Sequence, residues 1–176
     1  SRRQRQMCIR DSVTGTLLMI IANFGVRTYQ VSDVEEKHSF MDYQINRWIT
    51  CVLMVLVGAV YCTIRGYDST MFYISLGVYL YKMIDGLADV YEGRLQQVDK
   101  LYLAGISQAL RSIAALVVFS LLLLITHNMI VASFGMAIAA AATFVVVTFP
   151  LTLLETPKAH GWSMGSVGAL FKNCAP

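Results

Sequence analysis

Residues 106–153, ISQALRSIAALVVFSLLLLITHNMIVASFGMAIAAAATFVVVTFPLTL, decide the fold of this chain. The stretch holds two apolar runs, 106–126 and 129–153, and only His127 and Asn128 stand between them. Each run is long enough to cross the hydrocarbon core of a bilayer, which takes roughly 20 helical residues. Because open backbone cannot face lipid, so short a connection predicts two antiparallel membrane helices joined as a hairpin.

Three more apolar segments precede this hairpin, at 13–26, 48–64 and 70–90. The first is too short to cross a bilayer and is expected to be the remnant of a cut helix. Of the whole chain, 56% is hydrophobic and only 14% is charged, whereas about a quarter of the residues in soluble domains are charged. The sequence therefore predicts an all-α, polytopic membrane helix bundle, whose last helix is expected to end or bend at Pro150.

The first twelve residues are set aside because residues 2–12 look like the translation of a sequencing adapter, so 1–12 are read as a non-native scar. This scar holds four arginines and one aspartate, and the rest of the chain has ten basic and ten acidic residues. The formal net charge of +3 thus comes from the scar. No basic excess is left to favour a nucleic-acid partner.

Basic side chains gather on one side of the predicted helices. Eight Lys or Arg residues lie in the long segments of that side, whereas the opposite side has Arg65 alone. By the positive-inside rule, the long segments are cytoplasmic. We expect amphipathic cytoplasmic loops at 27–47 and 91–105, and a further cytoplasmic segment at 154–176. Both loops are expected to be structured, since Leu95, Val98 and Leu101 recur at helical spacing in the second.

Ionisable residues inside the predicted span 70–90 are the clearest functional signal. Lys82, Asp85 and Asp89 recur at spacings of three and four residues and therefore share one helix face. Charges within a bilayer usually face protein or water, so this face is expected to line a cavity or to pack on a neighbouring helix. The structural alternative is an ion pair near the cytoplasmic surface, either Lys82 with Asp85 or Asp89 with Arg111.

Residues typical of metal and redox sites are scattered along the chain. No cysteine pair has C-x-x-C spacing and the three histidines stand alone, so no metal site and no cofactor are predicted. The stretch DGLAD at 85–89 resembles the opening motif of the CDP-alcohol phosphotransferases. However, the arginine of that motif is missing, and the downstream aspartates of the motif do not follow. We expect no catalytic residue and no enzyme activity.

Three stretches carry a longer resemblance, namely NFGVRTYQVSD at 23–33, SFMDYQINRWITC at 39–51 and YKMIDGLADVYEGRLQQVDKLYLAGISQALRS at 81–112. They resemble the Wzx-type polysaccharide and oligosaccharide flippases, also called lipopolysaccharide biosynthesis proteins. These flippases belong to a superfamily that also contains multidrug and toxic-compound exporters. The resemblance covers nearly all of the chain from Val13 onward.

The resemblance implies a two-lobe transporter of about 12 to 14 helices, of which this chain holds about helices two to six of the first lobe. Residues 154–176 would then be the linker to a missing second lobe. The resemblance also implies a multi-pass protein of the bacterial plasma membrane, which acts as a monomer beside polysaccharide polymerases or glycosyltransferases. Its task would be to move undecaprenyl-pyrophosphate-linked oligosaccharide to the outer leaflet by alternating access. The alternative is a cation-coupled multidrug or toxic-compound exporter, and a CDP-alcohol phosphotransferase is more remote.

A transporter of this kind needs cationic side chains that contact the doubly anionic pyrophosphate. From the position of their charges in the predicted span, we expect Asp85 and Asp89 to be gating or ion-coupling partners. For two of the candidate pyrophosphate contacts, Arg27 and Arg94, the alternative role is that of positive-inside topology determinants. The complete set of candidate pyrophosphate contacts is Arg27, Lys82, Arg94 and Arg111.

Overall fold

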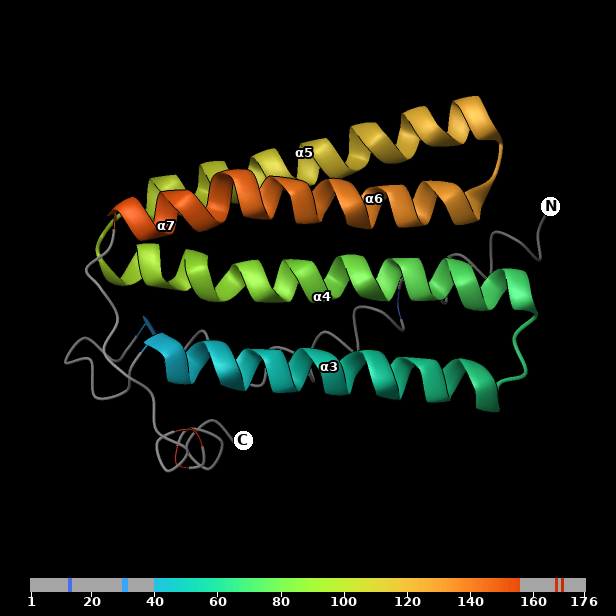
Figure 1. Ribbon diagram of the computed structural model, residues 1–176, viewed down its shortest axis with the longest axis horizontal. Coiled ribbons are helices and arrows are strands. Elements are labelled where there is room, and N and C mark those ends of the chain that lie inside the picture. Colours follow the sequence, from blue (N-terminus) through green and yellow to red (C-terminus); the bar gives the residue numbers. More distant parts are fainter. Residues whose placement is uncertain (1–12, 14–29, 32–39, 156–166, 168, 170–176) are drawn as a thin grey trace.

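The structure is a computed structural model that describes residues 40–155 continuously, together with Val13, Gln30, Val31, Val167 and Ala169. Between Phe40 and Glu155 the chain is helical except for short connections, and this part contains no strand (Figure 1). The elements in chain order are α3 (Phe40–Ile64), α4 (Ser69–Gln97), α5 (Leu101–Thr126), α6 (Met129–Thr143), the π-helical turn η1 (Phe144–Thr148) and α7 (Phe149–Glu155).

The helices lie side by side and alternate in direction (Figure 1). The turns that follow α3 and α5 lie at one end of the bundle, and the turn between α4 and α5 lies at the other end, near the end of α7. Within the described residues, three helices are long and apolar enough to cross a membrane: α3, α5 and the continuous helix Met129–Glu155. These observations confirm the all-α membrane helix bundle.

Helix α4 is long enough to span a bilayer but is more polar than its neighbours. Its 29 residues extend over about 43 Å. It packs against α3 on one side and against α5, α6 and α7 on the other. Two of its glycines permit close approach: a Cβ on Gly77 would lie 2.7 Å from Cβ of Ser133, and one on Gly86 would lie 3.1 Å from Sγ of Cys51. The most charged helix is therefore the most enclosed one.

The helices extend further than the apolar runs that predicted them. The predicted loop 91–105 is helical for all but three residues, since α4 continues to Gln97 and α5 begins at Leu101. The end of the predicted loop 27–47 is likewise the start of α3. At the end of α4 and the start of α3 the added turns carry buried polar side chains, among them Glu92, Arg94 and Asn46, whose burial hydropathy alone does not register. The predicted scar, the segment 13–26 beyond Val13, and the predicted linker beyond Glu155, apart from Val167 and Ala169, lie outside the described residues.

Local chemistry explains the two-residue turn between α5 and α6. His127 has a left-handed backbone conformation (φ 49°), and its N–H donates to the carbonyl of Leu123 at 3.0 Å, which closes α5. The side-chain oxygen of Asn128 then accepts from the backbone N–H of Ile130 at 3.0 Å and caps α6. The pair His-Asn therefore ends one helix and begins the next.

Pro150 does not end the last helix, which continues past it to Glu155. Proline lacks an N–H, and its ring displaces the carbonyl four residues earlier, that of Val146. The helix accommodates this displacement by widening into the π-helical turn 144–148 and then continues to Glu155. The hydroxyls of Ser107 on α5 and Thr148 lie 2.6 Å apart, which fixes the widened turn against α5.

Candidate functional site

Helix α4 carries three carboxylates, and the helices on either side carry the arginines that bind them. Arg111 on α5 donates from Nη1 to Oε1 of Glu92 at 2.5 Å. Its Nε and Nη2 donate to Oδ1 of Asp85 at 3.2 and 2.7 Å. The side chains of Arg111 and Glu92 are each only 1% exposed. Arg111 therefore joins α5 to two carboxylates of α4 away from solvent.

Arg47, on the neighbouring helix α3, forms an ion pair with Asp89. The Arg47 side chain is fully buried. We call these five residues the α4 ion-pair network: Arg47, Asp85, Asp89, Glu92 and Arg111. With three carboxylates and two guanidinium groups, its formal charge is −1 when all are ionised.

Neither of the two ion pairs suggested by the sequence, Lys82 with Asp85 and Asp89 with Arg111, forms in the structure. Asp85 binds Arg111, and Asp89 binds Arg47. The antiparallel packing of α3 on α4 places Arg47 beside Asp89, because Cys51, one turn further along α3, meets Gly86 on α4.

Two members of this network were not among the predicted site residues. Arg47 falls in the predicted loop 27–47, and Glu92 falls in the predicted loop 91–105. The signal for Glu92 was present, since Asp85, Asp89 and Glu92 follow the i, i+4, i+7 spacing of one helix face. No comparable local signal marks Arg47.

The structure separates the predicted pyrophosphate contacts into different environments. Arg111 directs its hydrogen bonds to two carboxylates and is 1% exposed, so this arrangement does not present it to a ligand. Arg94 is buried, donates to the side chain of Gln97 at 3.2 Å and lies 6.0 Å from the ring centroid of Phe40. Arg27 lies outside the described residues.

Lys82 differs from these arginines. It stands 13 residues after Ser69 and 15 before Gln97, and therefore about 20 Å from either end of α4. Its side chain is half-buried, and its ammonium group lies 5.7 Å from the ring centroid of Tyr81. Among the described residues no carboxylate forms an ion pair with Lys82. Lys82 is thus a cation at the middle of a bilayer-length helix, and none of the carboxylates that the structure describes neutralises it directly.

Metal and thiol chemistry have no matching arrangement in the described part of the chain. No group of three or more His, Cys, Asp or Glu side chains there could hold a metal ion. Cys51 and Cys62 are buried free thiols, and Cys51 lies in the apolar contact between α3 and α4.

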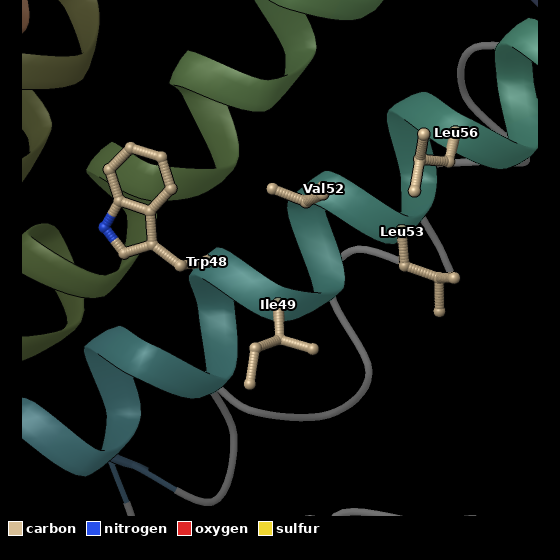
Figure 2. A pocket seen from close by; sticks show the side chains of 5 residues that line it. All are labelled: Trp48, Ile49, Val52, Leu53 and Leu56. Carbon is tan, nitrogen blue, oxygen red and sulfur yellow. The ribbon is translucent and has the colours of Figure 1, made fainter.

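A shallow apolar depression runs along the outside of α3. Figure 2 shows its five lining side chains along more than two turns of that helix. All are apolar and exposed, as expected for a surface that faces acyl chains. The lining residues are Trp48, Ile49, Val52, Leu53 and Leu56.

Comparison of the chain with models of protein families, with curated proteins and with solved structures gives no match. The resemblance to Wzx-type flippases therefore stays a hypothesis from the sequence.

Proposed function

We propose that this chain is the membrane-embedded part of a transporter that moves lipid-linked oligosaccharide across the bacterial plasma membrane. This is the function that the resemblance to Wzx-type flippases implies. The proposal rests on Lys82, a cation near the middle of α4 without a carboxylate partner among the described residues. Ionisable groups within a bilayer are costly and usually mark the path of a substrate or an ion.

The chemistry of the substrate supports this role for Lys82. A pyrophosphate that crosses the hydrocarbon core needs compensating positive charge at the depth where bulk water is absent. An ammonium group donates three hydrogen bonds and binds phosphate oxygens as a point charge. In the proposed transporter, Lys82 contacts the pyrophosphate at the midpoint of its passage.

The carboxylates have a second role in the proposal. Asp85 and Asp89 join α4 to α5 and α3 through Arg111 and Arg47. Motion of α4 relative to either neighbour requires these ion pairs to break or exchange, which makes the two aspartates gating residues. Arg111 and Arg47 then hold the helices together and do not contact the substrate directly in this conformation.

The alternative function, export of cationic drugs or toxic compounds, fits Lys82 less well. A positive charge at the centre of the path repels a cationic substrate, whereas it attracts an anionic head group. An exporter of this kind would lower the accumulation of cationic dyes in expressing cells and leave surface glycan unchanged.

The experiment uses the complete gene in a bacterium that lacks its own flippase. We expect Lys82→Gln to abolish surface polysaccharide while the amount of protein in the membrane stays unchanged. The matched control is Lys100→Gln, because Lys100 forms an ion pair with Glu155 at the helix ends, where both side chains are partly exposed. Full complementation by Lys82→Gln would refute the proposal.

A further inference from the structure

Lys82 has one acidic neighbour on its own helix. Asp85 is the only acidic residue within four positions of Lys82 in the sequence. Side chains three residues apart on a helix are neighbours, and opposite charges at this spacing stabilise a helix as an ion pair. In the structure Lys82 and Asp85 do not form this pair, and the carboxylate of Asp85 binds Arg111 instead.

Arg111 directs two of its three donor nitrogens to one oxygen of Asp85. Its Nε and Nη2 donate to Oδ1 of Asp85 at 3.2 and 2.7 Å, and its Nη1 donates to Oε1 of Glu92 at 2.5 Å. The Arg111 side chain is only 1% exposed, so these contacts are made away from solvent. The charge of Asp85 is therefore neutralised from α5 and not by Lys82 on its own helix.

The other carboxylates of α4 lie two or more turns from Lys82. Asp89 and Glu92 stand seven and ten residues beyond Lys82, which corresponds to about 10 Å and 15 Å along the helix axis. Asp89 is also paired with an arginine of α3. Asp85 is thus the carboxylate of α4 that would bind Lys82 if Arg111 released it.

We propose that Arg111 is a positioning residue, which keeps the ammonium group of Lys82 available for the pyrophosphate by holding the carboxylate of Asp85. This inference rests on the proposed function and adds to it a residue that acts through Lys82. A carboxylate and a pyrophosphate compete for the same ammonium group, since both offer anionic oxygen acceptors. Without Arg111, Asp85 and Lys82 would neutralise one another at a depth where bulk water does not screen them. The site would then lose its attraction for an anionic head group.

Two other roles for Arg111 lead to different expectations. A direct contact with the pyrophosphate would be lost in every variant that lacks the guanidinium group. A purely structural role would depend mainly on the more deeply buried carboxylate, because the Glu92 side chain is 1% exposed and that of Asp85 is 20% exposed. Only the positioning role makes binding depend on Asp85 and Lys82 once Arg111 has been removed.

The test measures binding of farnesyl pyrophosphate by the full 176-residue chain in lipid nanodiscs. The starting variant is Arg111→Met/Glu92→Gln, which leaves no stranded charge at the most buried position. We expect its Kd to be about 10- to 100-fold above that of the wild-type chain, the loss of a charge-assisted hydrogen bond. Adding Asp85→Asn should bring the Kd back to within about 3-fold of wild type, since a carboxamide cannot neutralise Lys82. Adding Lys82→Gln as well should raise the Kd again.

Lys100→Met is the matched control, because it breaks an ion pair between partly exposed side chains at the helix ends. It should leave the Kd unchanged, and circular dichroism should show the same helicity for all variants. If the methionine variant does not fold, Arg111→Gln/Glu92→Gln gives the same comparison, because two carboxamides can hydrogen-bond to one another.

The outcomes separate this inference from the proposed function. If Asp85→Asn does not restore binding to the starting variant, while Lys82→Gln in the wild-type chain weakens binding, the positioning role is refuted and the proposed function stands. The same holds if Arg111→Met/Glu92→Gln binds the probe as the wild-type chain does. If the wild-type chain does not bind, or if Lys82→Gln in that chain leaves the Kd unchanged, both proposals fail.

Discussion

Replacing Arg111 by methionine should destabilise the bundle by about 3–5 kcal/mol, the usual cost of removing one partner from a buried ion pair. The structure indicates a value in this range because Arg111 binds two carboxylates at once, Asp85 and Glu92. The Glu92 side chain is 1% exposed, so water cannot solvate the carboxylate that the substitution leaves behind. Methionine keeps most of the volume, which limits the loss of packing.

Thermal unfolding in detergent micelles, followed by circular dichroism, measures the effect. For a chain of this size, roughly 3 °C of Tm corresponds to 1 kcal/mol, so the expected decrease is about 9–15 °C. The matched control is Lys100→Met, which breaks the ion pair with Glu155. Those side chains are 33% and 40% exposed, and exposed pairs contribute only about 0–1 kcal/mol.

A second variant separates the ion pair from the packing of the side chain. Adding Glu92→Gln to Arg111→Met removes the stranded carboxylate, so the double variant should recover part of the lost stability. Arg111→Lys should fall between wild type and Arg111→Met, because one ammonium group cannot reproduce the forked donors that reach Asp85 and Glu92 together. The reasoning is refuted if Arg111→Met lowers Tm no more than Lys100→Met does.

Three further outcomes are expected. Gly77→Ala should destabilise the bundle by about 1–3 kcal/mol, because the added Cβ would lie 2.7 Å from Cβ of Ser133. The control Gly105→Ala meets no atom within 4 Å and should be neutral or stabilise the bundle by up to about 1 kcal/mol. Equal Tm values for the two variants would contradict this. Asn128→Ala removes the side-chain cap of α6 and should cost about 1 kcal/mol in the same thermal unfolding assay, so an unchanged Tm would show that the cap is unimportant. A cysteine that replaces Asp68, in the turn between α3 and α4, should react with a membrane-impermeant thiol reagent from outside the cell, and labelling only from the cytoplasmic side would reverse the assigned orientation.

Much of the fold follows from short-range features of the sequence. The apolar runs 106–126 and 129–153, with His127 and Asn128 between them, predict the α5–α6 hairpin, because length, hydropathy and turn chemistry act within a few residues. The common face of Lys82, Asp85 and Asp89 also follows from helical spacing alone. In both cases the sequence was sufficient because the relevant neighbours are close along the chain.

The pairing of charges was decided only by the tertiary structure. Arg47 and Asp89 are 42 residues apart, and Arg111 lies 26 residues from Asp85 and 19 from Glu92. Which arginine meets which carboxylate depends on the register of packed helices, and small side chains such as Gly86 against Cys51 determine that register. Hydropathy treats every charge as a solvent-facing group, so it placed Glu92 in a loop. Only the packed bundle shows that an arginine satisfies it, because the energy of a buried charge depends on its partner and not on its own position in the sequence.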